Sequence, residues 1–168
     1  SLQDKIKSVS SFKDSLGENL IGIEKEGLRV AKDGSIAQTP HPESFGSALT
    51  HPEITTDFSE ALVEIVTRPT KGASNVIDEL SKINHYINFH LGSNERFWPA
   101  SMPCILRGKT NIPIAYYGES NLGKMKTVYR RGLAYRYGSV MQAIAGIHFN
   151  YSFSLEFWDS YQKTITSE

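Results

Sequence analysis

Two carboxylates stand two residues apart in the segment from Ile21 to Val30 (IGIEKEGLRV). In a β-strand, side chains two residues apart share a face and are separated by roughly 6.6 Å. Glu24 and Glu26 therefore face the same way as Leu28, at a spacing that suits two carboxylates binding neighbouring cations. The spacing suits a salt-bridged ladder on a charged edge strand equally well. Other segments must decide between these readings.

A further carboxylate falls inside an apolar run. Residues 62–67 (LVEIVT) are rich in β-branched side chains and end shortly before Pro69, which favours a strand. On that strand Glu64 points the same way as apolar side chains, where a carboxylate is costly to bury without a partner. Asp57 and Glu60 precede the run. The alternative is a helix on which Glu60 and Glu64 form a solvated pair.

The segment 146–154 (GIHFNYSFS) alternates completely. This period predicts a strand with one core face and one face of hydrogen-bonding or ligating groups. A solvent-facing sheet surface is the alternative, although such surfaces more usually carry Lys, Glu and Thr. The predicted polar face holds His148, Asn150, Ser152 and Ser154, and the predicted core face holds Ile147, Phe149, Tyr151 and Phe153.

Together these segments offer five acids and an imidazole. Oxygen-rich ligand sets select hard ions, Mg²⁺ or Mn²⁺, and Mn²⁺ tolerates an added imidazole. Hard ions held by carboxylates usually serve phosphate chemistry, so the residues indicate a metal-dependent phosphoryl-transfer enzyme. No Cys/His spacing typical of zinc is present, and Cys104 is expected to be a small buried hydrophobic residue. The candidate ligands are Glu24, Glu26, Asp57, Glu60, Glu64 and His148.

Helices and turns must position these strands. Apolar spacing predicts helices over residues 2–16, 74–91 and 123–137. Ser74 is expected to cap the second helix, with Asp78 and Glu79 in its first turn. Asp33-Gly34 predicts a hairpin turn after the first strand, residues 97–104 a packed loop or edge strand, and residues 117–124 a turn.

Length and charge restrict the class of protein. A chain of 168 residues is expected to form one domain with a real core. Eighteen basic and eighteen acidic residues cancel, so no overall field favours nucleic acid or an anionic membrane. The basic, tyrosine-rich helix 123–137 could suggest nucleic acid, but the neutral balance of the chain and the absence of a recognised binding motif argue against such a partner. A single cysteine and the absence of a membrane-spanning run predict a cytoplasmic protein.

Six blocks, in order along the chain, resemble bacterial glutamate–cysteine ligase (γ-glutamylcysteine synthetase) of the proteobacterial type. These blocks are residues 22–30, 54–65, 98–104, 117–121, 129–138 and 146–152. The resemblance implies an α+β, glutamine-synthetase-like fold, in which a curved, mainly antiparallel sheet carries helices on its outside. It also implies the first step of glutathione synthesis, in which ATP phosphorylates the γ-carboxylate of L-glutamate and the amine of L-cysteine attacks the acyl phosphate.

The resemblance also implies roles for individual residues. Tyr129 and Leu133 are similar to the wall of a cysteine pocket, with Arg130 beside them. Asn150 is expected to touch glutamate, and Glu26 and Arg130 are the expected catalytic residues. The expected ligands for Mg²⁺, or for Mn²⁺ in its place, are Glu24, Glu26, Asp57, Glu64 and His148.

The family's enzymes are much longer, and residues 1–168 resemble only their N-terminal part. The chain is therefore expected to be one segment of a ligase catalytic domain, inactive alone, with exposed sheet edges that favour self-association. Two alternatives stay open. One is a non-catalytic binding or assembly module that keeps the fold, and the other is the N-terminal part of a bifunctional glutathione synthetase.

Overall fold

Strand β1 (Leu20–Ala31) is the centre of a five-stranded antiparallel sheet. The computed structural model describes residues 3, 6, 10, 13–106 and 111–166. On one side β1 pairs with β3 (Leu62–Val66), which pairs in turn with β2 (Ile54–Thr56). On its other side β1 pairs with β5 (Ile147–Ser152) along its first half and with β4 (Glu95–Phe97) at its end. The strand predicted over residues 62–67 is therefore confirmed, and the helical alternative is wrong.

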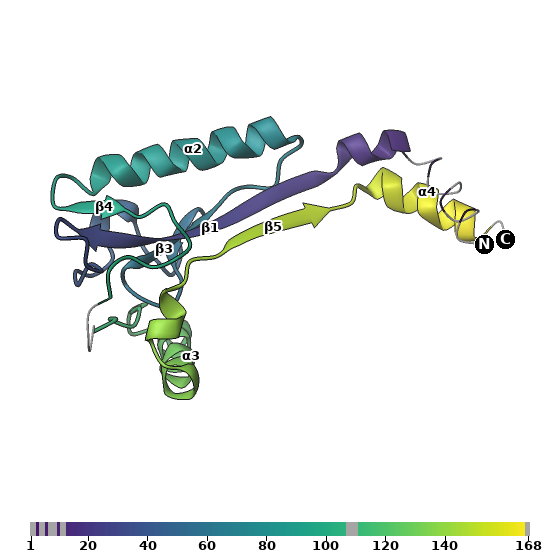
Figure 1. Cartoon of the computed structure of the whole chain (residues 1–168). Coiled ribbons are helices and arrows are strands. Elements are labelled where there is room, and N and C mark those ends of the chain that lie inside the picture. Colours follow the sequence, from purple (N-terminus) through teal and green to yellow (C-terminus); the bar gives the residue numbers. More distant parts are fainter. Residues whose placement is uncertain (1–2, 4–5, 7–9, 11–12, 107–110, 167–168) are drawn as a thin grey trace.

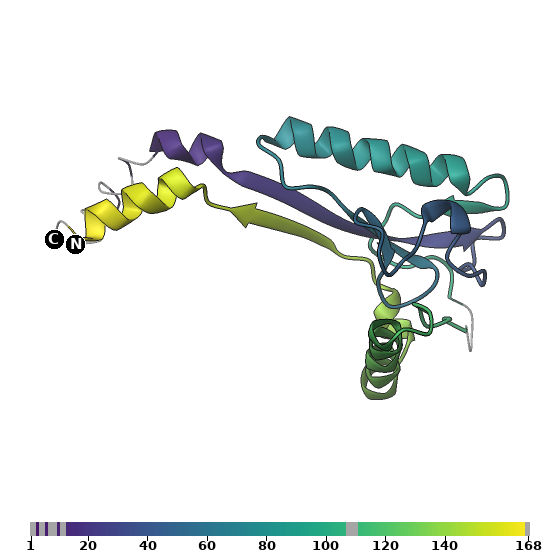
Figure 2. The same ribbon diagram turned by 180° about the vertical axis from the view of Figure 1, so that it is seen from behind.

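Helix α2 (Ala73–His90) covers the sheet face opposite the acids (Figures 1 and 2). Its buried Ile83 and Ile87 pack with Val63 and Ile65 of β3 in one apolar cluster. The predicted start of this helix needs correction. Gly72 is the N-cap, Ser74 lies in the first turn without capping it, and no acid falls in that turn.

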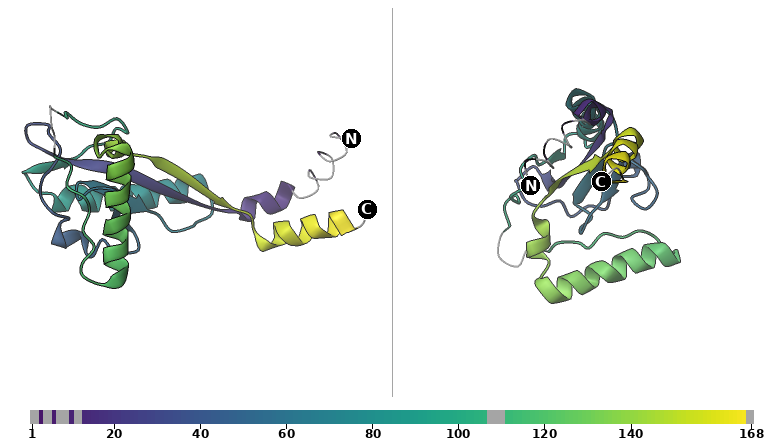
Figure 3. Two further views of the ribbon diagram at one scale, coloured as in Figure 1. Left: turned by 90° about the horizontal axis from the view of Figure 1, so that it is seen from below. Right: turned by 90° about the vertical axis from the view of Figure 1, so that its right-hand side faces the viewer.

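Helix α3 (Asn121–Tyr137) lies on the other side of the sheet (Figures 1 and 3). Its first residue is two positions before the predicted start, because the Ser120 side chain accepts a hydrogen bond from the Gly123 amide and caps the helix. Leu133 packs against a core cluster that includes Leu28 and Leu62. This cluster covers one end of the sheet face that carries Glu24, Glu26 and Glu64. Glu24 and Glu26 are half-buried.

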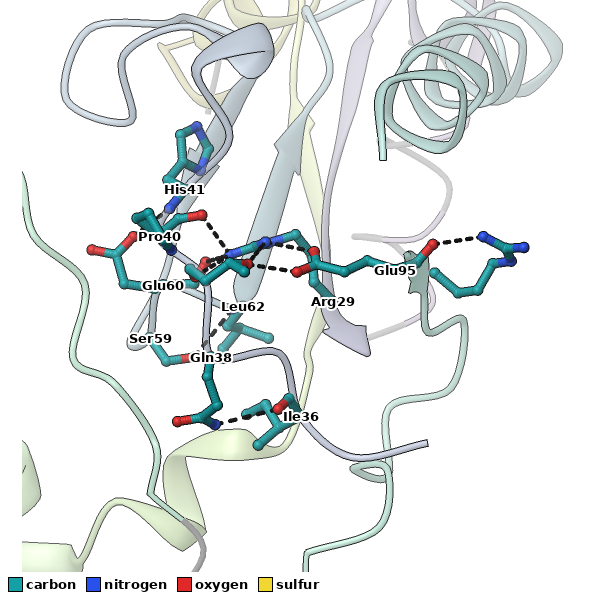
Figure 4. Close-up of polar contacts among 11 residues, drawn as sticks. Arg29, Ile36, Gln38, Pro40, His41, Ser59, Glu60, Leu62 and Glu95 are labelled. Carbon is teal, nitrogen blue, oxygen red and sulfur yellow. Dashed lines mark hydrogen bonds and ion pairs between the residues drawn. The ribbon is translucent and has the colours of Figure 1, made fainter. Parts of the chain in front are cut away.

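A buried arginine fixes the loops at the end of β1 (Figure 4). Arg29 is 1% exposed, and its guanidinium lies 2.6 Å from a Glu95 carboxylate oxygen. It also donates to the backbone carbonyls of Thr39, Pro40 and Glu60. Removing one partner of a buried ion pair typically costs roughly 3–5 kcal/mol, so this contact stabilises the loop that carries Glu60.

Strand β5 departs most from its prediction. All six of its residues are exposed, whereas the alternation predicted a core face. Phe149 is 64% exposed and Tyr151 is 48% exposed, because β1 and β5 extend as a two-stranded ribbon toward α4 (Leu155–Thr166) (Figure 3). The alternation predicted the strand correctly and its burial wrongly.

The remaining predicted elements are mostly present. The turn after β1 holds Gly34 with φ 80°, and Val30 bridges to Ile36 as a hairpin requires. Cys104 is buried, as predicted. Most of the predicted helix 2–16 lies outside the described residues, and a 3₁₀ helix η1 (Lys13–Glu18) runs through the glycine expected to end it. Short 3₁₀ helices η2 (Glu43–Phe45) and η3 (Val140–Ala143) complete the fold.

Candidate active site

Strand register brings the predicted ligands onto one face of the sheet. Glu24 of β1 is paired with His148 of β5, and Glu26 of β1 is paired with Glu64 of β3. Directly opposed residues in an antiparallel pair point to the same side, with Cβ atoms roughly 4.5–5.5 Å apart. The side chains of these four residues, which come from three strands, therefore lie close together on one face of the sheet.

Hydrogen bonds hold these carboxylates in place. The Gly146 amide donates to Glu26 Oε2 at 2.6 Å, and the Asn150 amide donates to Glu24 Oε1 at 3.0 Å. His148 Nδ1 lies 3.7 Å from Glu24 Oε2, and its side chain is 60% exposed. The loop before β5 thus supplies a backbone N–H donor to Glu26. Strand β5 itself places the side-chain amide of Asn150 and the imidazole of His148 beside Glu24.

Burial and like charge together make the site costly to ionise. Burial is the largest cause that raises the pKa of Glu64, to about 7, and Asp57, Glu26 and Glu24 raise it further. The pKa of Glu26 is also raised, chiefly by burial, although the Gly146 amide opposes that change. These acids repel one another, as expected of carboxylates that share a site without a cation.

Asp57 joins the group from the loop after β2, where α3 and Tyr117 hold its backbone. The Tyr117 hydroxyl donates to the carbonyls of Thr56 and Asp57, at 2.7 and 3.0 Å. Arg130 Nε donates to the Asp57 carbonyl, and the guanidinium stacks over the Tyr117 ring at 4.6 Å. The NH2 nitrogen of Arg130 lies 4.0 Å from Asp57 Oδ1. In this arrangement Arg130 orients Asp57.

Glu60 has a different task from the one its charge suggested. One carboxylate oxygen accepts the His41 amide at 2.6 Å, and the other accepts the Tyr116 amide at 2.7 Å. The side chain is 9% exposed and ties two loops together. Because both oxygens accept hydrogen bonds from backbone donors, the structure gives Glu60 a role in holding the loops and offers no support for it as a ligand.

The predicted substrate-binding residues on α3 lie one turn apart. Tyr129 is 59% exposed, while Leu133 is partly buried against the core. Both flank Arg130, so their helix borders the Asp57 end of the acid face. Sequence reasoning gave no role to Tyr117, which fixes this junction. The only signal for it was its place at the start of a glycine-flanked block.

The chemistry of the donor set suits a hard cation. Carboxylates with one imidazole match Mg²⁺ or Mn²⁺, and a cation would relieve the repulsion that raises the pKa of Glu64. Within residues 13–106 and 111–166, however, no three His, Cys, Asp or Glu side chains stand ready as a set of ligands. Glu24 and Glu26 are turned to Asn150 and Gly146 instead, so the metal site stays a prediction.

Comparison with known proteins decides the family. The family model for glutamate-cysteine ligase matches residues 5–168. The chain belongs to the glutamate–cysteine ligase family. The ligase of Hahella chejuensis is 55% identical over 144 residues, which are 86% of this chain and 27% of that protein. The ligase of Alcanivorax borkumensis is 53% identical over 82% of this chain and 26% of that protein.

Solved structures of ligases share the fold. A Francisella tularensis glutamate–cysteine ligase, crystallised with AMP, has a TM-score of 0.83 at 40% identity and covers 88% of this chain. A bifunctional glutathione synthetase from Pasteurella multocida has a TM-score of 0.78 at 32% identity over 92% of this chain. This ligase-family chain covers 30% and 20% of those structures. The predicted α+β fold with a mainly antiparallel sheet is confirmed, and the sheet is open.

Proposed function

We propose that this chain forms the acid-bearing wall of an active site that joins the γ-carboxyl of L-glutamate to the amine of L-cysteine. The observation that carries the proposal is the placement of Glu24, Glu26, Glu64 and His148 on one face of one sheet. The match to the ligase family supports it. The product is γ-glutamylcysteine, formed in the first step of glutathione synthesis.

The proposed reaction has two steps. First, a γ-carboxylate oxygen of glutamate takes the terminal phosphoryl group of ATP, which gives γ-glutamyl phosphate and ADP. Second, the cysteine amine attacks the acyl carbon, the amine loses a proton and phosphate leaves. Such transfers need alignment and neutralised charge more than a protein nucleophile. The acids therefore suffice without a Ser/His/Asp set, and the AMP in the related Francisella structure supports nucleotide use.

In this proposal Mg²⁺, or Mn²⁺ in its place, is held by carboxylate and imidazole groups of the acid face. When bound, the ion neutralises charge on the phosphate oxygens. Glu26 faces the reacting groups, and the Gly146 amide keeps its carboxylate in position. The proposed ligands are Glu24, Glu26, Asp57, Glu64 and His148.

Helix α3 provides the amino-acid side of the proposed site. Tyr129 and Leu133 form the wall of the cysteine pocket, and their helix adjoins the acids through Arg130 and Asp57. The guanidinium of Arg130 lies 4.0 Å from Asp57 Oδ1 and suits an anionic substrate beside it. Its contacts with Asp57 and Tyr117 hold it in that place.

We propose that residues 1–168 are the N-terminal segment of the catalytic domain of a cytoplasmic ligase and are inactive alone. A chimera tests this directly. Residues 1–168 replace the matching part of the Hahella chejuensis ligase, and γ-glutamylcysteine formation is measured with ATP, Mg²⁺, glutamate and cysteine. We expect an active chimera and an inactive isolated chain. A folded chimera without activity would refute the function, and an active isolated chain would refute the claim of inactivity alone.

One alternative has its own supporting observation. The Pasteurella multocida structure shows that a bifunctional glutathione synthetase shares this fold. Its identity of 32% is below the 40% of the Francisella ligase, so the monofunctional ligase is the better supported parent.

In the described residues no helix is both long and apolar enough to cross a membrane.

The free edge of β5 supports self-association. Within the part of the chain that the structure describes, this strand pairs with β1 only, and its outer face exposes Ile147, Phe149 and Tyr151. An unpaired strand edge beside aromatic side chains is a template for pairing with another chain. We propose that isolated copies of this chain associate through β5.

A further inference from the structure

One cation of helix α3 has no partner among the residues that the structure describes. The helix carries five Lys and Arg side chains, which make its sequence basic. Arg131 is the one without a hydrogen bond, an ion pair or a ring contact to another described residue. The other four each lie beside an aromatic ring or a carboxylate: Lys124, Lys126, Arg130 and Arg136.

Arg131 lines a pocket of about 330 Å³ between α3 and the loop that leads into the helix. On the helix side, Lys124, Val128 and Arg131 follow one another at spacings of four and three, so they share one face. On the loop side, Tyr116 and Glu119 line the pocket. The volume lies within the roughly 300–1,000 Å³ of typical small-molecule sites.

The carboxylate in this pocket is engaged by groups other than Arg131. The Tyr116 hydroxyl donates to Glu119 Oε1, and Lys124 Nζ lies 3.1 Å from Glu119 Oε2. The hydrogen bond from Tyr116, and then the contact with Lys124, lower the pKa of Glu119, so its carboxyl is ionised at neutral pH. The lining therefore holds two cations and one carboxylate, which leaves one net positive charge.

This balance of charge favours a ligand with a single negative charge. A guanidinium binds a carboxylate through two parallel hydrogen bonds. A phosphate dianion would bring a second negative charge toward Glu119 without a second free cation to match it. The rest of the lining favours an apolar body, because Val128 is 61% exposed and Tyr116 is 54% exposed, and a ligand between them would take both out of water.

The pocket is distinct from the proposed active site. At 3.6 residues per turn, Val128 and Arg131 lie along one edge of α3 and Tyr129 along the other. Arg130, which contacts Asp57, lies between these two edges. A ligand beside Arg131 is therefore on the side of the helix away from the proposed cysteine pocket.

We propose that this pocket binds a small carboxylic acid with an apolar body. Its carboxylate pairs with Arg131, and its body lies between Val128 and the Tyr116 ring. This site is additional to the proposed ligase reaction and does not depend on it.

Titration of the 168-residue chain with benzoate at pH 7, followed by backbone amide NMR, tests the proposal. We expect the amides of Gly118, Val128 and Arg131 to shift saturably at millimolar benzoate. Benzyl alcohol, which has the same ring without the charge, should bind at least about tenfold more weakly.

Two variants should change benzoate affinity in opposite directions. Arg131→Gln removes the cation and should weaken binding at least about tenfold. Glu119→Gln removes the negative charge and frees Lys124, so it should strengthen binding. Arg136→Gln is the matched control, because Arg136 is on the same helix outside the pocket. All three side chains are exposed, so we expect each variant to keep the wild-type spectrum away from its own position.

Four results would overturn the proposal. These are no saturable shift with benzoate, shifts centred on Tyr129 and Leu133, equal affinity for benzyl alcohol, and unchanged affinity in Arg131→Gln. Tighter binding of phenyl phosphate than of benzoate would overturn the choice of a carboxylate. The ligase chimera tests the proposed function separately, so failure of either experiment leaves the other conclusion standing.

Discussion

Replacing Glu64 by glutamine should stabilise the chain at alkaline pH and leave it nearly unchanged at acid pH. In the fold the pKa of Glu64 is about 7, because burial and three nearby carboxylates disfavour its charge. The unfolded chain has the ordinary value of 4.5. Between these values the folded state binds more protons, so stability falls as pH rises from about 4.5 to about 7. Glutamine carries no such charge, so the Glu64→Gln variant does not lose folding stability in this way as pH rises.

The magnitude follows from the two pKa values and the exposure of the side chain. At about 1.36 kcal/mol for each pKa unit, the difference corresponds to about 3 kcal/mol. Glu64 is only half-buried, and solvent screening reduces the gain to about 1–2 kcal/mol. For a chain of this length, that is a rise in Tm of about 2–8 °C.

Thermal unfolding of the wild type and Glu64→Gln, followed by circular dichroism at pH 5 and pH 8, measures this. Glu43→Gln is the matched control, because Glu43 is exposed in η2 on a different part of the chain. We expect a gain for Glu64→Gln at pH 8 that largely disappears at pH 5. Equal gains at both pH values, or a loss at pH 8, would show that burial and the neighbouring carboxylates do not disfavour the charged form of Glu64.

Three further predictions follow from named contacts. Arg29→Met should lower the free energy of unfolding, measured in urea, by about 3–5 kcal/mol, because it leaves Glu95 without its cation. A urea midpoint that does not change beyond experimental error would contradict a stabilising role for Arg29. In the active chimera, Tyr129→Ala should raise the KM for cysteine and leave that for ATP unchanged, and an effect on ATP alone would move Tyr129 out of the pocket. Phe149→Lys should shift the isolated chain toward monomer in sedimentation equilibrium, whereas unchanged association would exclude the β5 face.

The strands of the candidate site, and the face that each polar side chain takes, were predictable from the sequence, whereas the pairing of the strands was not. Glu64 among β-branched residues and His148 among aromatics each point to one face, and register then sets them opposite Glu26 and Glu24. Charge alone was a poorer guide. Glu60 resembles the other acids in sequence, yet both of its oxygens are used by backbone amides from distant loops.

Features that depend on what covers a surface were not predictable. Alternation in β5 signals a strand with two unlike faces, but it cannot say whether another element packs on the apolar one. Phe149 and Tyr151 are exposed for that reason. Likewise, Tyr117 gains its importance from hydrogen bonds to residues about sixty positions earlier in the chain, and no local pattern encodes such a contact.

The central claim is that acids from separate strands form one cation-binding face. Calorimetric titration of the 168-residue chain with Mn²⁺ at neutral pH tests it most directly, with Glu26→Gln and the distant Glu43→Gln compared side by side. We predict saturable binding that Glu26→Gln abolishes and Glu43→Gln retains. Absence of binding in the wild type, or binding that Glu26→Gln leaves unchanged, would contradict the account.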